Sequence, residues 1–200
     1  MESASHKLIP KIAVADNTSE VFCVKFAPEG NYLAAGCGDG AIRVFSTENG
    51  NLAYNLQSGS NVALPTTAMK FRPPDATNSR TKNVFLAANA AGAVQHWHMT
   101  SGKCLHSFSD EDNQVYTLDY NIEGSQFVTA GKDKIVRLYD EATKSLLVAM
   151  QGSQYAGSSK DTAGHSNRIF SSKFVPHDQN LLLTGGWDNT VMVWDIRSGN

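Results

Sequence analysis

A short pattern recurs four times along the chain. It is clearest in residues 181–195, which read Leu-Leu-Leu-Thr-Gly-Gly-Trp-Asp-Asn-Thr-Val-Met-Val-Trp-Asp. Two apolar runs around a Gly- and Asp-rich centre predict two antiparallel strands joined by a tight turn. Weaker copies upstream carry an aromatic residue at the matching place of the second strand; the four aromatics are Phe45, Trp97, Tyr139 and Trp194. A pattern that returns at a regular interval indicates a repeat architecture.

Each copy is expected to contain four strands, and no stretch of useful length has helical periodicity. The underlying unit is about 40–45 residues, and the longer intervals carry polar insertions. The expected units are 16–57, 58–109, 110–151 and 165–200. The insertions at 72–83 and 152–164 are predicted to be loops, because they are polar and rich in turn-forming residues. The chain is therefore expected to be all-β.

The two ends of the chain leave two arrangements open. Residues 1–6 are polar and expected to be disordered, whereas 7–15 reads as one strand that Pro10 confines to a sheet edge. The last unit stops where its outer strand should begin. The preferred interpretation is that these residues form the first half of a longer ring. The alternative is that strand 7–15 pairs with 191–196 and closes a ring of four units, or joins a second copy. An unpaired edge would favour self-association.

The repeats resemble the WD40-repeat family over about residues 7 to 200. In the last unit, Gly164-His165 and Trp194-Asp195 stand where that family carries its GH and WD signatures. The resemblance implies a β-propeller of about four blades, each with four antiparallel strands, that is part of a larger propeller. It also implies a hydrogen-bonded tetrad of His165, Thr184, Asp188 and Trp194. The other three units lack the histidine, so we expect them to depend on apolar packing and turn geometry.

The tetrad has a physical logic of its own. An imidazole between a carboxylate and a hydroxyl, with an indole N–H on the same hydroxyl, satisfies several buried polar groups together. A His, a Thr and an Asp also suggest a catalytic triad. Because their spacing belongs to a repeated motif, a structural role is the preferred hypothesis.

Two other groups of residues suggest ligand sites at first glance. His96 and His98 flank Trp97, so in a strand both point to the face opposite that tryptophan. Two imidazoles are too few for a zinc site, and a solvated or interblade role is preferred. The glycines in 36–40 open no helix and precede no phosphate-loop lysine, which argues against nucleotide binding. No cofactor and no metal are therefore expected.

The candidate partner-binding residues lie at the start of the innermost strands and in a turn. Four residues occupy the place four positions before the aromatic that ends each first strand: Phe22, Thr67, Tyr116 and Phe170. They are expected to ring the mouth of the channel, where they either grip a partner or simply plug the opening. Trp187 occupies an exposed turn, which is typical of an interface anchor. Arg168, Lys132 and Lys134 are expected near the same face.

Composition restricts the function further. The chain has 200 residues and a formal net charge of −2, which argues against nucleic acid or anionic membrane as the main partner. Three cysteines do not make a disulfide framework, and no apolar run reaches about 20 residues. These features favour the cytoplasm, with nuclear or cytoskeletal association left open. We expect a non-enzymatic scaffold for protein–protein interactions within a multiprotein assembly. The alternative is a recognition subunit that binds a peptide or modified tail at the channel mouth, as in chromatin or ubiquitin-ligase complexes.

Overall fold

The computed structural model describes residues 11–14, 18–57, 64–74, 82–110, 112–151 and 164–197. These residues form four separate antiparallel sheets, three with four strands and the last with three. The prediction of an all-β propeller fold is confirmed. The helix recorded among them is a single 3-10 turn, η2, at Met99–Ser101.

Within every sheet the strands lie side by side in sequence order. The first sheet consists of β1 (Val21–Phe26), β2 (Tyr32–Cys37), β3 (Ile42–Ser46) and β4 (Leu52–Leu56). The second consists of β5 (Thr66–Phe71), β6 (Val84–Asn89), β7 (Ala93–His98) and β8 (Lys103–Ser109). The third consists of β9 (Val115–Tyr120), β10 (Gln126–Gly131), β11 (Val136–Asp140) and β12 (Leu146–Met150). The last consists of β13 (Ile169–Val175), β14 (Asp178–Gly186) and β15 (Val191–Asp195).

The turn between the second and third strand of a sheet is built in the same way three times. An aspartate carboxylate accepts a backbone N–H two residues further on, as in Asp188 with Thr190 at 3.1 Å. Asp39 and Asp133 make the equivalent bond at the same distance. The residue after this aspartate has a positive φ, which glycine, asparagine and, at some cost, lysine adopt. The repeated aspartate therefore fixes the turn geometry.

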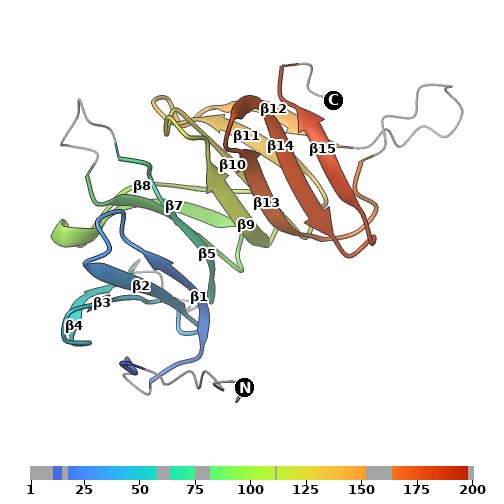
Figure 1. Ribbon diagram of the computed structural model, residues 1–200. Helices are drawn as coiled ribbons and strands as arrows, with labels where there is room; N and C mark the ends of the chain where they lie inside the picture. Colours follow the sequence, from blue (N-terminus) through green and yellow to red (C-terminus); the bar gives the residue numbers. More distant parts are fainter. Residues whose placement is uncertain are drawn as a thin grey trace, which may run out of the picture.

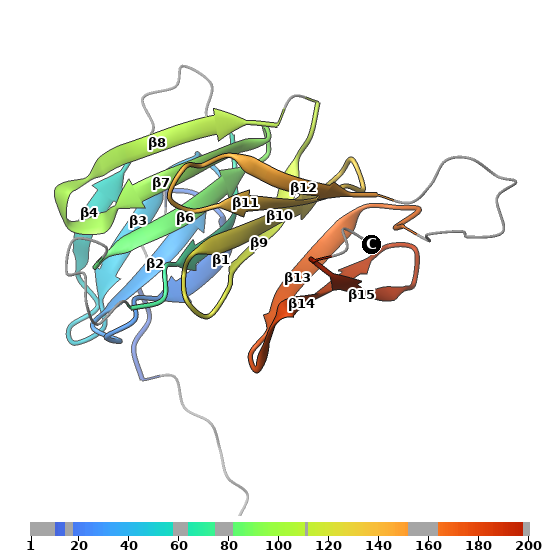
Figure 2. The same ribbon diagram turned by 90° about the horizontal axis from the view of Figure 1, so that it is seen from above.

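The four sheets follow one another as the blades of an open arc, with the first and last blade at its two ends (Figure 1). The innermost strands β1, β5, β9 and β13 lie next to one another in that order. The view from above shows the last blade continuing the same turn beyond β9 (Figure 2). This arrangement brings the first strands of all repeats to one side, as a propeller requires.

The apolar core is divided among the junctions between neighbouring blades. Trp97 and Phe85 of the second blade pack with Ile42 and Val44 of the first. Phe127 lies in the cluster between the second and third blades. Trp194 lies in the cluster between the third and fourth. Each blade is therefore stabilised chiefly by its neighbours, as in other repeat proteins.

The last blade leaves one flank open in the described chain. The side chains of Val191 and Val193 are 76% and 62% exposed, and β15 has no strand on its outer side within the described residues. Met192 and Trp194 alternate with them and point into the junction with the third blade. The flank therefore consists of apolar side chains beside an unpaired backbone edge.

The predicted strand 7–15 stays a prediction. Its described part, residues 11–14, joins none of the four sheets and lies beside the turn after β3. There, Ile12 and Val14 are so close that a Cβ on Gly50 would meet them at 3.0 and 3.4 Å. The remainder of that segment, residues 1–6, most of loop 72–83 and nearly all of loop 152–164 lie outside the described residues.

Candidate functional site

The four residues of the tetrad form one chain of hydrogen bonds in the last blade. His165 Nδ1 lies 2.7 Å from an oxygen of Asp188, and His165 Nε2 lies 2.7 Å from the Thr184 hydroxyl. The Trp194 indole donates to the same hydroxyl at 2.7 Å. With the proton of the imidazole on Nδ1, the hydroxyl accepts from Trp194 and donates to His165. The chain joins the segment before β13, strand β14, the turn after β14 and the end of β15.

Asp188 is the most heavily bonded member of this chain. Burial acts to raise its pKa, but hydrogen bonds from Thr190 and His165 outweigh burial and hold the pKa well below its usual range. The backbone N–H of Ser166 also donates to this carboxylate, at 2.9 Å. A carboxylate with this many donors stays ionised. It therefore fixes the turn that carries Trp187.

Three of the predicted partner-binding residues form a continuous stack, which we call the aromatic ladder: Tyr116, Phe170 and Trp187. The rings of Tyr116 and Phe170 have centroids 4.7 Å apart, with planes 10° from parallel. The Phe170 and Trp187 centroids are also 4.7 Å apart, at an interplanar angle of 39°. Trp187 is 62% exposed and Phe170 is 38% exposed, so the ladder opens onto solvent at its Trp187 end.

The predicted basic residues lie beside the ladder to different degrees. The Arg168 guanidinium is 5.8 Å from the centre of the Trp187 ring, within the range of a cation–π contact. Its carbonyl also accepts the Trp187 N–H at 2.9 Å. Lys132 is exposed, and its backbone N–H donates to Gln114, whose side chain accepts the Tyr116 hydroxyl. Lys132 therefore lies near the Tyr116 end of the ladder.

The other two residues predicted at the channel mouth do not join the ladder in the described contacts. Phe22 is 55% exposed on β1 and lies beside the turn at Gly38. The Thr67 hydroxyl bonds with the carbonyl of Val115, so it links the innermost strands of two blades. The predicted ring of side chains is thus represented here by a ladder across the third and fourth blades.

Comparisons with known proteins agree with this architecture. Residues 102–140 and 157–195 match the family profile described as "WD domain, G-beta repeat". Residues 4–72 match the profile of the WD40 domain of anaphase-promoting complex subunit 4. The chain is a WD40-repeat protein.

Relatives and a solved structure place this WD40 chain among larger proteins. Protein tipD of Dictyostelium discoideum is 23% identical to it, over 91% of the chain and 33% of tipD. COMPASS component SWD3 of Saccharomyces cerevisiae is 21% identical, over 92% of the chain and 51% of SWD3. A crystal structure of the mitotic checkpoint complex contains a similar fold with a TM-score of 0.72 and 17% identity, covering 93% of this chain and 51% of that one. The chain thus spans a third to about half of these proteins.

Two WD40 blades without the tetrad have a polar network of another kind, so the expectation of apolar packing and turn geometry alone is wrong for them. In the first blade, Arg43 contacts the turn aspartate Asp39 at 2.7 Å. In the third, Arg137 contacts Asp133 at 2.6 Å, and the Tyr139 hydroxyl donates to Asp110 at 2.8 Å. The arginine follows the aspartate by four residues in both blades, and this spacing is a sequence signal that could have revealed the pairs.

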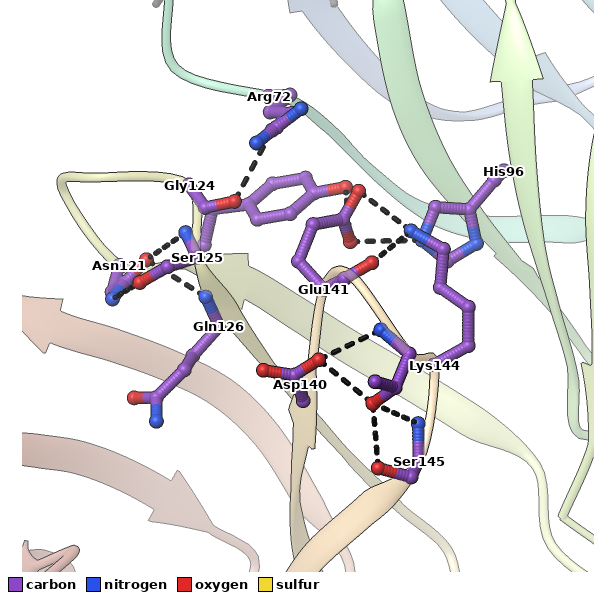
Figure 3. Close-up of polar contacts among 12 residues, drawn as sticks. Arg72, His96, Asn121, Gly124, Ser125, Gln126, Asp140, Glu141, Lys144 and Ser145 are labelled. Carbon is purple, nitrogen blue, oxygen red and sulfur yellow. Dashed lines mark hydrogen bonds and ion pairs between the residues drawn. The ribbon is translucent and has the colours of Figure 1, made fainter.

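A buried polar cluster connects the second and third blades (Figure 3). The Glu141 carboxylate lies 3.0 Å from His96 Nε2, 2.8 Å from Lys144 Nζ and 3.2 Å from the Tyr120 hydroxyl. Burial lowers the pKa of His96, so the imidazole is neutral and its Nε2–H donates to the carboxylate. For His96 the predicted alternatives were a solvated or an interblade role, and its contacts are interblade.

The described residues around His96 do not form a metal site. Within the described ranges, no three His, Cys, Asp or Glu side chains are grouped so that they could hold a metal ion. The other histidine of the pair, His98, contacts Ser101 at 2.8 Å and caps η2. No helix in the part of the chain that the structure describes is long and apolar enough to span a bilayer.

Proposed function

We propose that the chain is a non-enzymatic WD40 scaffold that binds protein partners through the aromatic ladder and Arg168. The observation that carries the proposal is Trp187, which is 62% exposed in a turn although the other two tryptophans are buried. Tryptophan and arginine are the residues most enriched at the energetic centre of protein interfaces. An exposed Trp beside an Arg is therefore the strongest anchor on the described surface.

The turn that carries Trp187 is held before any partner arrives. The backbone of Trp187 is bonded to Arg168, and the next residue, Asp188, is fixed by His165. Its ring is packed on Phe170. A side chain that is already ordered loses little conformational entropy on binding, which favours affinity.

The alternative of a recognition subunit for a modified or basic tail receives less support. A cage for a methylated ammonium needs open aromatic faces around one space. Here Tyr116 and Phe170 face each other, and Arg168 lies over the Trp187 ring. The cations Arg168 and Lys132 would also repel a basic peptide.

Names of similar proteins, such as a component of COMPASS, support membership of an assembly.

The proposal is tested by comparing the proteins that the full-length chain and its variants capture from cell extract. Trp187→Ala should lose captured proteins while its unfolding midpoint stays unchanged. Leu105→Ala is the matched control, because Leu105 is 56% exposed on the outer strand β8. Loss with Trp187→Ala alone supports the proposal. Identical captured proteins for wild type and Trp187→Ala would refute it.

The expected cytoplasmic location and the self-association through an unpaired edge stay predictions. The names of relatives point to several compartments, since they include a pre-mRNA-splicing factor and a microtubule-associated protein-like chain. A fluorescent fusion of the full-length protein would locate it directly.

A further inference from the structure

One row of side chains on the innermost strands is almost entirely basic. In each repeat the row is occupied by the residue directly before the aromatic at or next to the end of the first strand. The row consists of Lys25, Lys70, Asp119 and Lys173. Because the inner strands lie next to one another, equivalent positions come to one level of the arc. We call these four residues the basic row.

Asp119 is the centre of the basic row. Its side chain is 4% exposed, and one of its oxygens lies 2.6 Å from Lys70 Nζ and 3.4 Å from Lys173 Nζ. The other oxygen accepts the backbone N–H of Phe174 at 3.1 Å. The carboxylate is thus neutralised within the protein by Lys70 and Lys173. Lys25 lies near enough to Lys173 to act on its pKa, so the row of three lysines and one aspartate carries two positive charges in excess.

The excess charge is accessible from solvent. The side chain of Lys173 is 58% exposed and that of Lys70 is 31% exposed. Burial and the neighbouring ammonium groups of Lys70 and Lys25 lower the pKa of Lys173, whereas Asp119 acts against them. An added anion would reduce the repulsion between these like charges. Each ammonium also has three N–H donors, which one carboxylate does not use up.

The row borders a groove with apolar walls. Lys70, Lys173 and Asp119 line a cavity of about 380 Å³ together with Pro73, Ile122 and Pro176. Ile122 is 58% exposed, so the apolar wall is open to a ligand. The groove therefore offers cations and apolar contacts side by side.

This groove is separate from the aromatic ladder. Lys173 stands near the end of β13, whereas Phe170 stands near its beginning and Arg168 directly before it. Five residues of extended chain separate Arg168 from Lys173, or about 16 Å at ~3.3 Å per residue. A ligand in the groove and a partner on the ladder would occupy opposite ends of the inner strands.

We propose that the basic row and its groove bind an acidic peptide segment of a partner protein, with glutamate or aspartate side chains on the lysines and apolar residues on Ile122 and the prolines. Charge complementarity selects the acidic side chains, and the apolar wall selects a peptide over a free anion. The binding should weaken with salt, because partly exposed charges are screened. The aromatic ladder plays no part in it.

The test measures fluorescence anisotropy of a labelled peptide of alternating Glu and Leu, added to the full chain. A peptide with Gln in place of Glu and one with phosphoserine in place of Glu serve as comparisons. The Glu peptide should bind, and the double variant Lys25→Gln/Lys173→Gln should weaken it by about tenfold, while the Lys70–Asp119 pair remains. The matched control is Lys132→Gln/Lys134→Gln in the turn between β10 and β11, which should leave the affinity unchanged.

Asp119→Asn separates a ligand site from a merely structural cluster. Removing the carboxylate frees two ammonium groups, so this variant should bind the Glu peptide more tightly, provided that its circular dichroism remains native. Equal binding of the Glu and Gln peptides would overturn the proposal, as would equal losses in the two lysine double variants. Binding of the phosphoserine peptide alone would overturn it too, because the ligand would then be a phosphopeptide.

Discussion

The ring of Tyr116 in β9 lies almost parallel to the ring of Phe170 in β13, with centroids 4.7 Å apart. These residues belong to neighbouring blades, so the aromatic ladder crosses a blade boundary. The same boundary contains a bond between the hydroxyls of Thr117 and Ser172 at 2.9 Å. The geometry of the ladder therefore depends on the forces that hold the third and fourth blades together.

The tetrad should contribute measurably to the stability of the last blade. Thr184→Val removes the hydroxyl between His165 and Trp194. The buried Nε2 of His165 and the indole N–H of Trp194 then lose their hydrogen-bond partner. We expect the free energy of unfolding to fall by about 1–3 kcal/mol, measured by urea denaturation. Thr100→Val is the control, since Thr100 is exposed on η2. Equal stability of the two variants would contradict a structural role for the tetrad.

The arginine of the third blade should have a comparable role. Arg137 is only 16% exposed in its side chain and contacts Asp133, with Asp110 at 3.8 Å. Arg137→Met leaves these carboxylates without their cation, so we expect a loss of about 1–3 kcal/mol in urea denaturation. Arg197→Met removes a comparable pair with Asp195 at the surface and should have little effect. If Arg137→Met and Arg197→Met lose similar amounts of unfolding free energy, burial does not make the Arg137 pair more stabilising than the surface pair.

The burial of His96 should make the protein sensitive to mild acid. Burial lowers the pKa of His96 from its usual value of 6.5, so the unfolded chain binds the proton first as the pH falls. Stability is then full above about pH 6.5 and decreases below it. We expect the urea midpoint to drop between about pH 7.5 and 5.5, and the drop to shrink in His96→Gln. His177 is exposed, so His177→Gln should show the same fall in the urea midpoint as the wild type. A fall in His96→Gln as large as in the wild type would contradict this account.

Two glycines in second strands, Gly131 in β10 and Gly185 in β14, should differ in how far a Gly→Ala substitution lowers stability. A Cβ on Gly131 would lie 1.9 Å from the Gln114 carbonyl oxygen, in backbone that cannot move aside cheaply. We expect Gly131→Ala to lower the unfolding free energy by about 1–3 kcal/mol, seen as a lower Tm. Gly185→Ala, whose Cβ would stay 4.0 Å from Ser171, should be tolerated. If both variants melt alike, Gly131 does not lie against the backbone of Gln114.

The open flank of the last blade should promote self-association of this chain. Val193 is 62% exposed beside the unpaired edge of β15. Val193→Lys places a charge on that flank, and we expect it to lower the weight-average mass in sedimentation experiments. Leu105→Lys, on β8, should leave the mass unchanged. A wild-type chain that sediments as a monomer at every concentration would argue against this flank as a self-association surface.

The sequence was sufficient for the repeat architecture because three of the four repeats carry a turn aspartate, Asp39, Asp133 and Asp188, and all four carry an aromatic residue in the third strand. It also pointed to Trp187, since an aromatic in a polar turn has no local packing partner. It did not show that Tyr116 and Phe170 meet, because register between blades depends on the packing of separate sheets. The Glu141 cluster was missed for the same reason: His96 and Glu141 are 45 positions apart and meet only after two blades have packed.

The central claim is that partners contact the chain at Trp187, and photo-cross-linking tests it most directly. A benzoylphenylalanine placed at position 187 of the full-length protein should form covalent adducts with partner proteins upon illumination in cell extract. The same group at position 105, on the exposed outer strand β8, should form none of these adducts. Adducts of equal yield at the two positions, or adducts at position 105 alone, would contradict the account.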